Sequence, residues 1–225
     1  MASHLSLPDA MPAFALRFVG QEALPPRLSE FDLEQFFTLL SDDVVAIRAQ
    51  FRSDHRLPAA LMLLFMRVAG RPLDGFNVLP RNLLRKTAEA LAVSPPSIAS
   101  LRSIYTRRQT LSKHQLWAKT YLGLRELEPD DEAALTATLL AQAADASHSD
   151  DLVRSACQWL FTRRILIPGA RRLQDWARGA FAAVEVQILS EVNAAVPPAA
   201  ATKVIDSAYS ARPGGDDTHL EWLKT

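Results

Sequence analysis

The spacing of apolar residues in residues 54–70, "DHRLPAALMLLFMRVAG", constrains the fold of this chain more than any other feature. Apolar side chains recur there every three or four positions, which is the period of an α-helix that is buried along most of its surface. Ser53 precedes the segment and Gly70 closes it, so we expect the helix to lie between them. Pro58 falls within the first two turns, where proline costs least.

Composition extends this prediction to the whole chain. Leucine, alanine, arginine and glutamate dominate, and there are only eight glycines in 225 residues, which favours helices over sheets. We predict an all-α protein: a multi-helix bundle with a helix-turn-helix-like unit, followed by a second helical subdomain. The expected parts are an irregular arm (1–27), a basic helical domain (28–125), a helical support (126–196) and a linker toward a missing C-terminal part (197–225).

The charges are segregated although the net charge is zero. Residues 1–47 carry a net charge of −5 and residues 126–225 a net charge of −6, whereas residues 48–125 hold fourteen basic residues against three acids, a net charge of +11. This pattern indicates a surface for a polyanion between acidic flanks. Alternatively, these charges pair with the flanks in the folded protein. The fourteen are Arg48, Arg52, Arg56, Arg67, Arg71, Arg81, Arg85, Lys86, Arg102, Arg107, Arg108, Lys113, Lys119 and Arg125.

Residues 88–101, "AEALAVSPPSIASL", have the spacing of a helix-turn-helix corner within residues 81–105. Such a unit needs a small residue where the helices touch and apolar residues that hold the turn. Ala88 suits the close contact, and Ala92 stands where glycine is frequent. The apolar residues around the turn are Leu91, Val93, Ile98 and Leu101. Tight corners of this kind also occur in bundles that bind nothing.

The second helix of this corner is expected to start at Ser94 and Pro95, as cap and first residue, and to run to residue 105. Its prolines and serines are poor readers of base edges, so we expect base readout from the basic segment that follows. Trp117 is predicted in the core, and Arg107 and Arg108 on DNA. Alternatively, the charges of this segment are only solvated. The candidate DNA-binding residues are Arg85, Lys86, Ser97, Ser100, Arg102, Arg107, Arg108, Gln109, Lys113, His114 and Lys119.

Enzymatic motifs are not found in the sequence. It has no glycine-rich phosphate loop, no HExxH motif, no nucleophile elbow and no dinucleotide fingerprint. The run His148-Ser149-Asp150-Asp151 suits a helix start better than a metal site. Cys157 is alone and is expected to be a small buried residue. We therefore expect no catalytic residues, no cofactor and no metal, and, without a membrane-spanning run or signal peptide, an intracellular protein.

An ordered series of short motifs resembles the N-terminal region of the replicative transposases of the Tn-three transposon family. The resemblance covers roughly residues 28–195 and departs at Pro58 and Ala92, where the family tends to have glycine. Its pieces are Phe36-Phe37-Thr38, Asp42-Asp43, Arg56-Leu57, Arg67 with Gly70-Arg71, and the runs "LPRNLLRKTAEALAVSPPSI", "YTRRQTLSKHQLWAKTYLGLREL" and "LFTRRILIPGARRLQDWA".

The resemblance implies a non-catalytic, DNA-binding function. In this family the N-terminal helical domains hold the terminal inverted repeats, and a distant C-terminal domain with three carboxylates and metal ions performs strand transfer. The partners implied are double-stranded DNA of the terminal repeats and further copies of the transposase, in the bacterial cytoplasm at the nucleoid. The alternative is an assembly module without sequence-specific DNA binding. An independent hydrolase or nuclease is disfavoured, because no carboxylate cluster is spaced for two metals.

Overall fold

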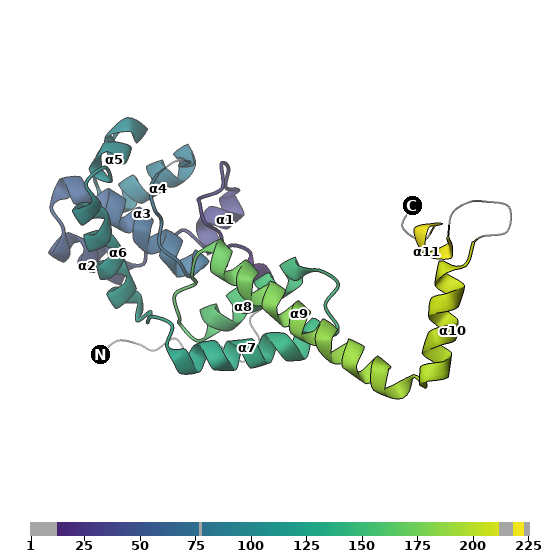
Figure 1. The fold of residues 1–225 in the computed structure, drawn as a ribbon. Coiled ribbons are helices and arrows are strands. Elements are labelled where there is room, and N and C mark those ends of the chain that lie inside the picture. Colours follow the sequence, from purple (N-terminus) through teal and green to yellow (C-terminus); the bar gives the residue numbers. More distant parts are fainter. Residues whose placement is uncertain (1–12, 77, 212–217, 223–225) are drawn as a thin grey trace.

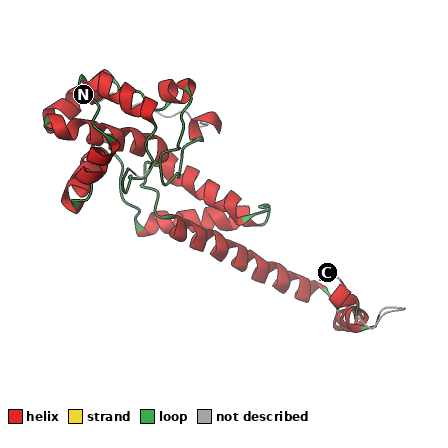
Figure 2. Ribbon diagram, turned by 90° about the horizontal axis from the view of Figure 1, so that it is seen from above, coloured by secondary structure: helices red, strands yellow, loops and turns green. Residues whose placement is uncertain are grey.

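The computed structural model describes residues 13–76, 78–211 and 218–222, and confirms the all-α class. Helices and loops form the described parts of the chain, with two isolated β-bridges (Figures 1 and 2). In chain order the elements are η1 (Ala13–Leu16), α1 (Glu30–Gln35), α2 (Ser41–Gln50), α3 (Ser53–Ala69), α4 (Arg81–Leu91), α5 (Ile98–Ile104), α6 (Arg108–Leu122), α7 (Pro129–Ala143), α8 (Ser149–Thr162), α9 (Ala170–Ala195), α10 (Pro198–Tyr209) and α11 (His219–Trp222).

Helix α3 is the centre of the first of two hydrophobic clusters. It is the helix predicted from the apolar spacing, and twelve of its seventeen side chains are buried, so it has apolar contacts on nearly every side. Helices α2, α4 and α6 pack around it (Figure 1). Gly70 ends it with a left-handed backbone, φ 71°, as its place in the sequence predicts.

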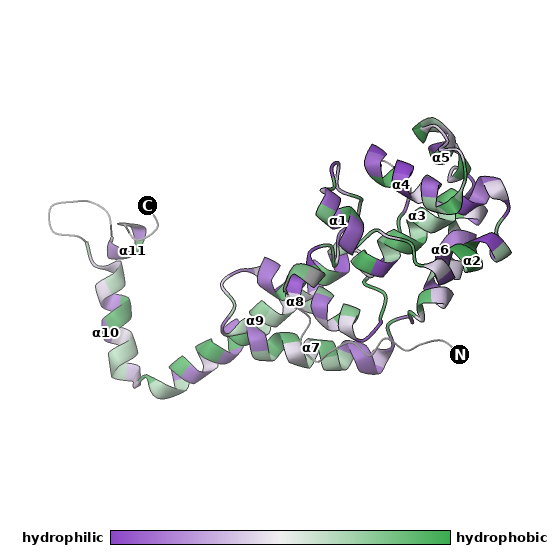
Figure 3. Cartoon of the chain, turned by 180° about the vertical axis from the view of Figure 1, so that it is seen from behind, coloured by the Kyte–Doolittle hydropathy of each residue, from purple (hydrophilic) through white to green (hydrophobic). Residues whose placement is uncertain are grey.

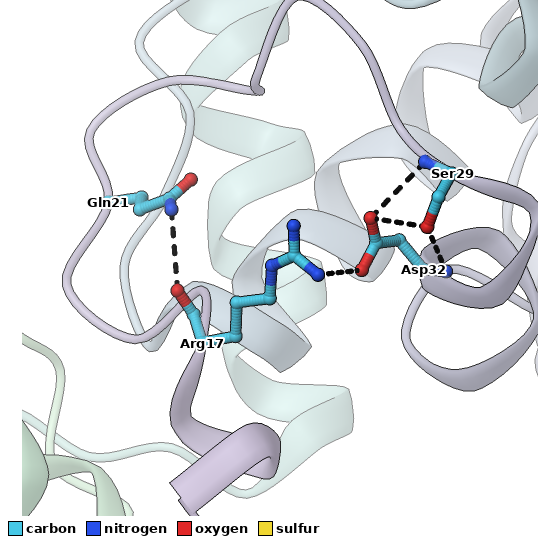
Figure 4. Close-up of polar contacts among 4 residues, drawn as sticks. All are labelled: Arg17, Gln21, Ser29 and Asp32. Atoms are coloured by element: carbon cyan, nitrogen blue, oxygen red, sulfur yellow. Dashed lines mark hydrogen bonds and ion pairs between the residues drawn. The ribbon is translucent and has the colours of Figure 1, made fainter.

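The described part of the expected N-terminal arm, residues 13–27, is packed against the first cluster; residues 1–12 lie outside the described residues. Phe18 and Leu24 are buried in the first cluster. The guanidinium of Arg17 binds the Asp32 carboxylate at 2.8 Å, and Asp32 also closes a capping box with Ser29, the cap of α1 (Figure 4). Apolar burial and this ion pair together fix the segment.

The connection between α4 and α5 is longer than the predicted corner, in which the second helix starts at Ser94 and Pro95. Ala92 is left-handed, φ 53°, and ends α4, but α5 begins only at Ile98, six residues later. The reason lies in Pro95 and Pro96, since a proline disfavours helical backbone in the residue before it. The cap is therefore Ser97, whose hydroxyl accepts a hydrogen bond from the Ser100 amide at 3.1 Å, and not Ser94.

The second hydrophobic cluster is formed by α7, α8 and α9, and includes the buried Cys157. An extended segment that follows α8 joins the two clusters. The Leu166 amide donates to the Arg125 carbonyl at 2.9 Å, and the Ile167 amide donates to the Gly70 carbonyl at 2.9 Å. The side chain of Ile167 is buried in the second cluster, so this segment belongs to both.

The chain after residue 196 was expected to be a linker, but it contains the twelve-residue helix α10. Val196 and Pro197 lie between α9 and α10, and the two helix axes are bent by 113°. The far half of α9 and α10 extend away from both clusters (Figures 1 and 2). In the described residues no single helix has the length and apolar composition to cross a membrane, and only this bent pair meets those criteria together.

Gly70 provides the first testable prediction. A β-carbon at this position would lie 2.8 Å from Phe161 and 2.9 Å from Ile167, and its positive φ disfavours any other residue. We expect Gly70→Ala to lower the free energy of unfolding by about 1 to 3 kcal/mol. Urea denaturation followed by circular dichroism measures this change.

Gly179→Ala is the matched control, because Gly179 lies within α9 and a β-carbon there meets nothing within 4 Å. This substitution should raise the free energy of unfolding by about 0.5 to 1 kcal/mol. Equal effects of the two substitutions would contradict the close packing of Gly70 against the second cluster.

Candidate nucleic-acid interface

Three arginines of the basic band hold backbone carbonyls inside the fold. Arg48 of α2 donates to the Leu91 carbonyl at the end of α4, at 3.0 Å. Arg56 donates to the Phe51 carbonyl at 3.1 Å. Arg102, a predicted DNA-binding residue, donates through Nε to the Phe76 carbonyl at 2.8 Å. These guanidiniums satisfy carbonyl groups that would otherwise lack partners, so part of the band has a structural role.

Four further members of the band form ion pairs with the acidic flanks. Arg67 binds the buried Asp43 at 2.6 Å, and Arg71 binds Glu22 at 3.0 Å. In the other flank, Lys119 binds Glu126 at 2.6 Å, and Arg125 binds Asp131. The Arg125 guanidinium lowers the pKa of the Asp131 carboxyl to about 2. The alternative interpretation of the band, pairing with the flanks, is thus correct for these four residues, one of which, Lys119, was a predicted phosphate contact.

Six cations on α4 and at the start of α6 are left for a partner, and we call them the free basic group. The side chains of five of them form no hydrogen bond or ion pair with the described residues, and the side chain of Arg85 has only a 3.9 Å ion pair with Glu89 on the same exposed helix face. Surface pairs of that length contribute little. The group consists of Arg81, Arg85, Lys86, Arg107, Arg108 and Lys113.

Sequence reasoning named five of these six as DNA-binding residues and missed Arg81. A signal for it existed, because Arg81 precedes Arg85 by four residues, which places both on one face of a helix. Helices α4, α5 and α6 follow one another in the chain, joined by the connections 92–97 and 105–107. Figure 1 shows α4 and α5 at the end of the molecule remote from α7.

The predicted serines of α5 are held by local hydrogen bonds. The hydroxyls of Ser97 and Ser100 lie 2.9 Å apart, and Ser103 donates to the Ser100 carbonyl at 2.7 Å. Helix α5 has only seven residues, and its buried Leu101 anchors it to the first cluster. The serines therefore stabilise the helix itself, whereas Gln109, at the start of α6, is exposed.

His114 was expected on the DNA-binding surface but is buried, with 1% of its surface exposed. Its Nδ1 lies 3.0 Å from the Tyr105 hydroxyl, which itself donates to the Pro58 carbonyl, so the imidazole is the donor in this pair. Burial lowers the pKa of His114 to about 4, with smaller contributions from His55 and Lys113. A buried neutral imidazole cannot contact a phosphate, and this residue joins α6 to the core. Trp117, which was predicted in the core, is partly buried and packs against the first cluster.

A groove of about 640 Å³ lies between α6 and the start of α9. The cations that line it are bound to acids: Arg71 to Glu22, Lys119 to Glu126, and Arg172 to Glu132 at 2.8 Å. The positive charges of the groove are therefore compensated within the fold. Uncompensated positive charge lies on α4 and the first turns of α6, and at the exposed Arg52 before α3.

Comparisons with known proteins agree with the extent of the two clusters. Residues 21–180 match a protein family described as a domain of unknown function (DUF4158). Over 206 residues the chain is 34% identical to a Comamonas testosteroni protein named transposase for insertion sequence element IS1071 in transposon Tn5271. The match covers 92% of this chain and 21% of that protein, so the chain spans about a fifth of the length of the relative.

The buried imidazole of His114 makes stability depend on pH. Its pKa is about 4 in the folded protein and about 6.5 when exposed, so the unfolded chain binds the proton more tightly. The contribution of His114 to the free energy of unfolding is therefore fully present above about pH 6.5 and is lost as the pH falls toward 4. Between pH 7 and pH 4.5 this one group should lower the free energy of unfolding by roughly 2 to 3 kcal/mol.

Urea denaturation of the wild type and of His114→Phe at the two pH values tests this prediction. The variant is expected to lose part of its stability at both pH values but to depend less on pH by roughly 2 kcal/mol. His148→Gln, a change at the exposed start of α8, is the control and should keep the wild-type dependence. A variant with the wild-type dependence would refute the assignment to His114.

Proposed function

The chain belongs to the DUF4158 family, and from this membership and its free basic group we propose that it is a non-catalytic, DNA-binding part of a transposase. The relative from Comamonas testosteroni is named a transposase, and its similarity extends over 92% of this chain. The finer proposal is a parent transposase of the Tn-three type, acting in the bacterial cytoplasm, whose terminal inverted repeats are the DNA bound by these residues. The motif series of residues 28–195 supports it.

The observation that carries the proposal is the free basic group. Cations already bound to acids or carbonyls gain little from DNA, because each new contact breaks an existing one. Five members of the group have no such cost, and Arg85 would give up only its 3.9 Å pair with Glu89. They come from one face of α4 and from the start of α6, and only Glu89 provides an acidic side chain on those helices. A phosphate backbone is the partner that matches this charge.

Binding through these cations should depend steeply on salt. Each phosphate that a cation neutralises releases condensed counterions, which adds about −0.9 to the slope of log affinity against log salt concentration. If all six members contact phosphates, the slope is about −5. Fluorescence anisotropy with a duplex of the terminal repeat and a scrambled duplex, at about 50 and 200 mM salt, measures both slope and preference.

The double variant Arg107→Ala/Arg108→Ala tests the assignment to the start of α6. We expect the slope to become shallower by about 2, because two phosphate contacts are lost. The control is Arg154→Ala/Arg178→Ala, which removes the same charge from exposed arginines that pair with acids on α8 and α9. The control should keep the wild-type slope. An unchanged slope in the first variant would exclude these arginines from the interface.

The second candidate function, an assembly module of the transposase, is favoured by exposed apolar residues on α9 and α10. Val186, Ile188, Leu189 and Val192 on α9 are each about half exposed or more, and α10 adds Val204, Ile205 and Tyr209. Figure 3 shows apolar stretches along both helices. Exposed apolar surfaces of this kind mark protein contacts. The assembly hypothesis predicts dimers that depend on concentration, and no salt-dependent DNA binding.

Sedimentation equilibrium of the wild type and of the double variant Ile188→Gln/Leu189→Gln separates the two functions. If assembly is the function, the wild type dimerises, the variant does not, and neither binds DNA with a steep salt slope. If DNA binding is the function, the variant keeps the affinity and slope of the wild type.

A further inference from the structure

Helix α6 presents one continuous exposed face with a composition unlike the rest of the molecule. Its fifteen residues include no acid, and its exposed side chains recur with the helical period. We call this surface the open face of α6; it consists of Arg108, Gln109, Ser112, Lys113, Leu116 and Thr120. At 1.5 Å per residue the helix is about 22 Å long, enough to lie along the major groove of a duplex over several base pairs.

The opposite face of α6 holds the helix rigidly. Tyr121 donates to the Asp43 carboxylate at 3.0 Å, and Gln115 donates to the Leu73 carbonyl at 2.9 Å. His114 adds its contact with Tyr105. A binding surface on a fixed helix is positioned more accurately than one on a loop.

Leu116 is the least expected member of the open face, because it is a large apolar side chain with 60% of its surface exposed. Part of its surface borders the groove beside α9. A single leucine between polar side chains is too small for a protein-docking patch. It suits contact with a thymine methyl group in the major groove, where apolar side chains recognise that base.

Helix α5, by comparison, has little with which to read bases. Its hydroxyls are held by local hydrogen bonds, and the long side chain of Arg102 is bound to the Phe76 carbonyl. The side-chain amide of Gln109 on α6, in contrast, forms no hydrogen bond with the described residues. A glutamine amide can form two hydrogen bonds with adenine, at N6 and N7.

We infer that α6, and not α5, is the helix that reads the DNA sequence, with Gln109, Ser112 and Leu116 against base edges and Arg108 and Lys113 on the flanking phosphates. This inference rests on the proposed function. Gln109 and Leu116 are seven residues apart, about 10 Å along the helix, which corresponds to about three base-pair steps of 3.4 Å. The open face therefore selects two A·T pairs about three base pairs apart.

Selection from a randomised pool of 20-base-pair duplexes with the full 225-residue chain tests this inference. The wild type is expected to enrich sequences with two A·T pairs at that spacing. Gln109→Ala should lose the preference at one pair by roughly tenfold, and Leu116→Ala should lose it at the other by a few-fold. Both side chains are uncharged, so the salt slope stays at the wild-type value. Ser100→Ala on α5 is the control and should keep both preferences.

The outcomes separate the failure of this inference from that of the proposed function. Binding of the unselected pool at about 50 mM salt is measured first, and its absence would overturn both. Binding without an enriched motif would overturn the reading by α6 and keep non-specific DNA binding. A motif that changes with Ser100→Ala but not with Gln109→Ala or Leu116→Ala would assign the reading to α5. Thermal melting confirms that each variant is folded, as expected for exposed side chains.

Discussion

Helix α3 is enclosed on nearly all sides, so it has no solvated charged face. Polar side chains of the neighbouring helices must therefore bind the polar groups around it. The buried Asp43 carboxylate of α2 does so with three hydrogen bonds. Its carboxylate accepts the Leu40 amide at 2.7 Å at the start of α2, Arg67 of α3 at 2.6 Å and the Tyr121 hydroxyl of α6 at 3.0 Å. One carboxylate thus joins three helices. Removing it would leave the Arg67 guanidinium, which is three-quarters buried, without its anion.

This arrangement divides the basic residues by function. Arg48, Arg56 and Arg102 are bound to carbonyls, and Arg67, Arg71, Lys119 and Arg125 are bound to acids, so these seven side chains stabilise the fold. Those of α4 and the first turns of α6 lie on faces that the core does not use, so their charge stays available. The positive surface is therefore smaller than the basic band of the sequence, but its charge is not compensated within the fold.

The apolar spacing predicted α3 and its end at Gly70, because burial imposes the helical period on the sequence directly. The burial of His114 could be read in the same way, since Leu111, His114 and Ala118 lie on one helical face. Local sequence could also have placed the start of α5 correctly, from the effect of Pro96 on Pro95. The ion pair of Arg71 with Glu22 could not be predicted, because the two residues are about fifty positions apart and only the tertiary fold brings them together.

The extended segment after α8 has a consequence for dividing the protein into pieces. A fragment that ends at the sequence boundary near residue 125 would lose the amides of Leu166 and Ile167, leaving the carbonyls of Arg125 and Gly70 without their partners. It would also uncover the apolar surface around Gly70 that Phe161 and Ile167 protect. The smallest fragment that keeps the first cluster closed must therefore continue through residue 168, and with it must carry α7 and α8.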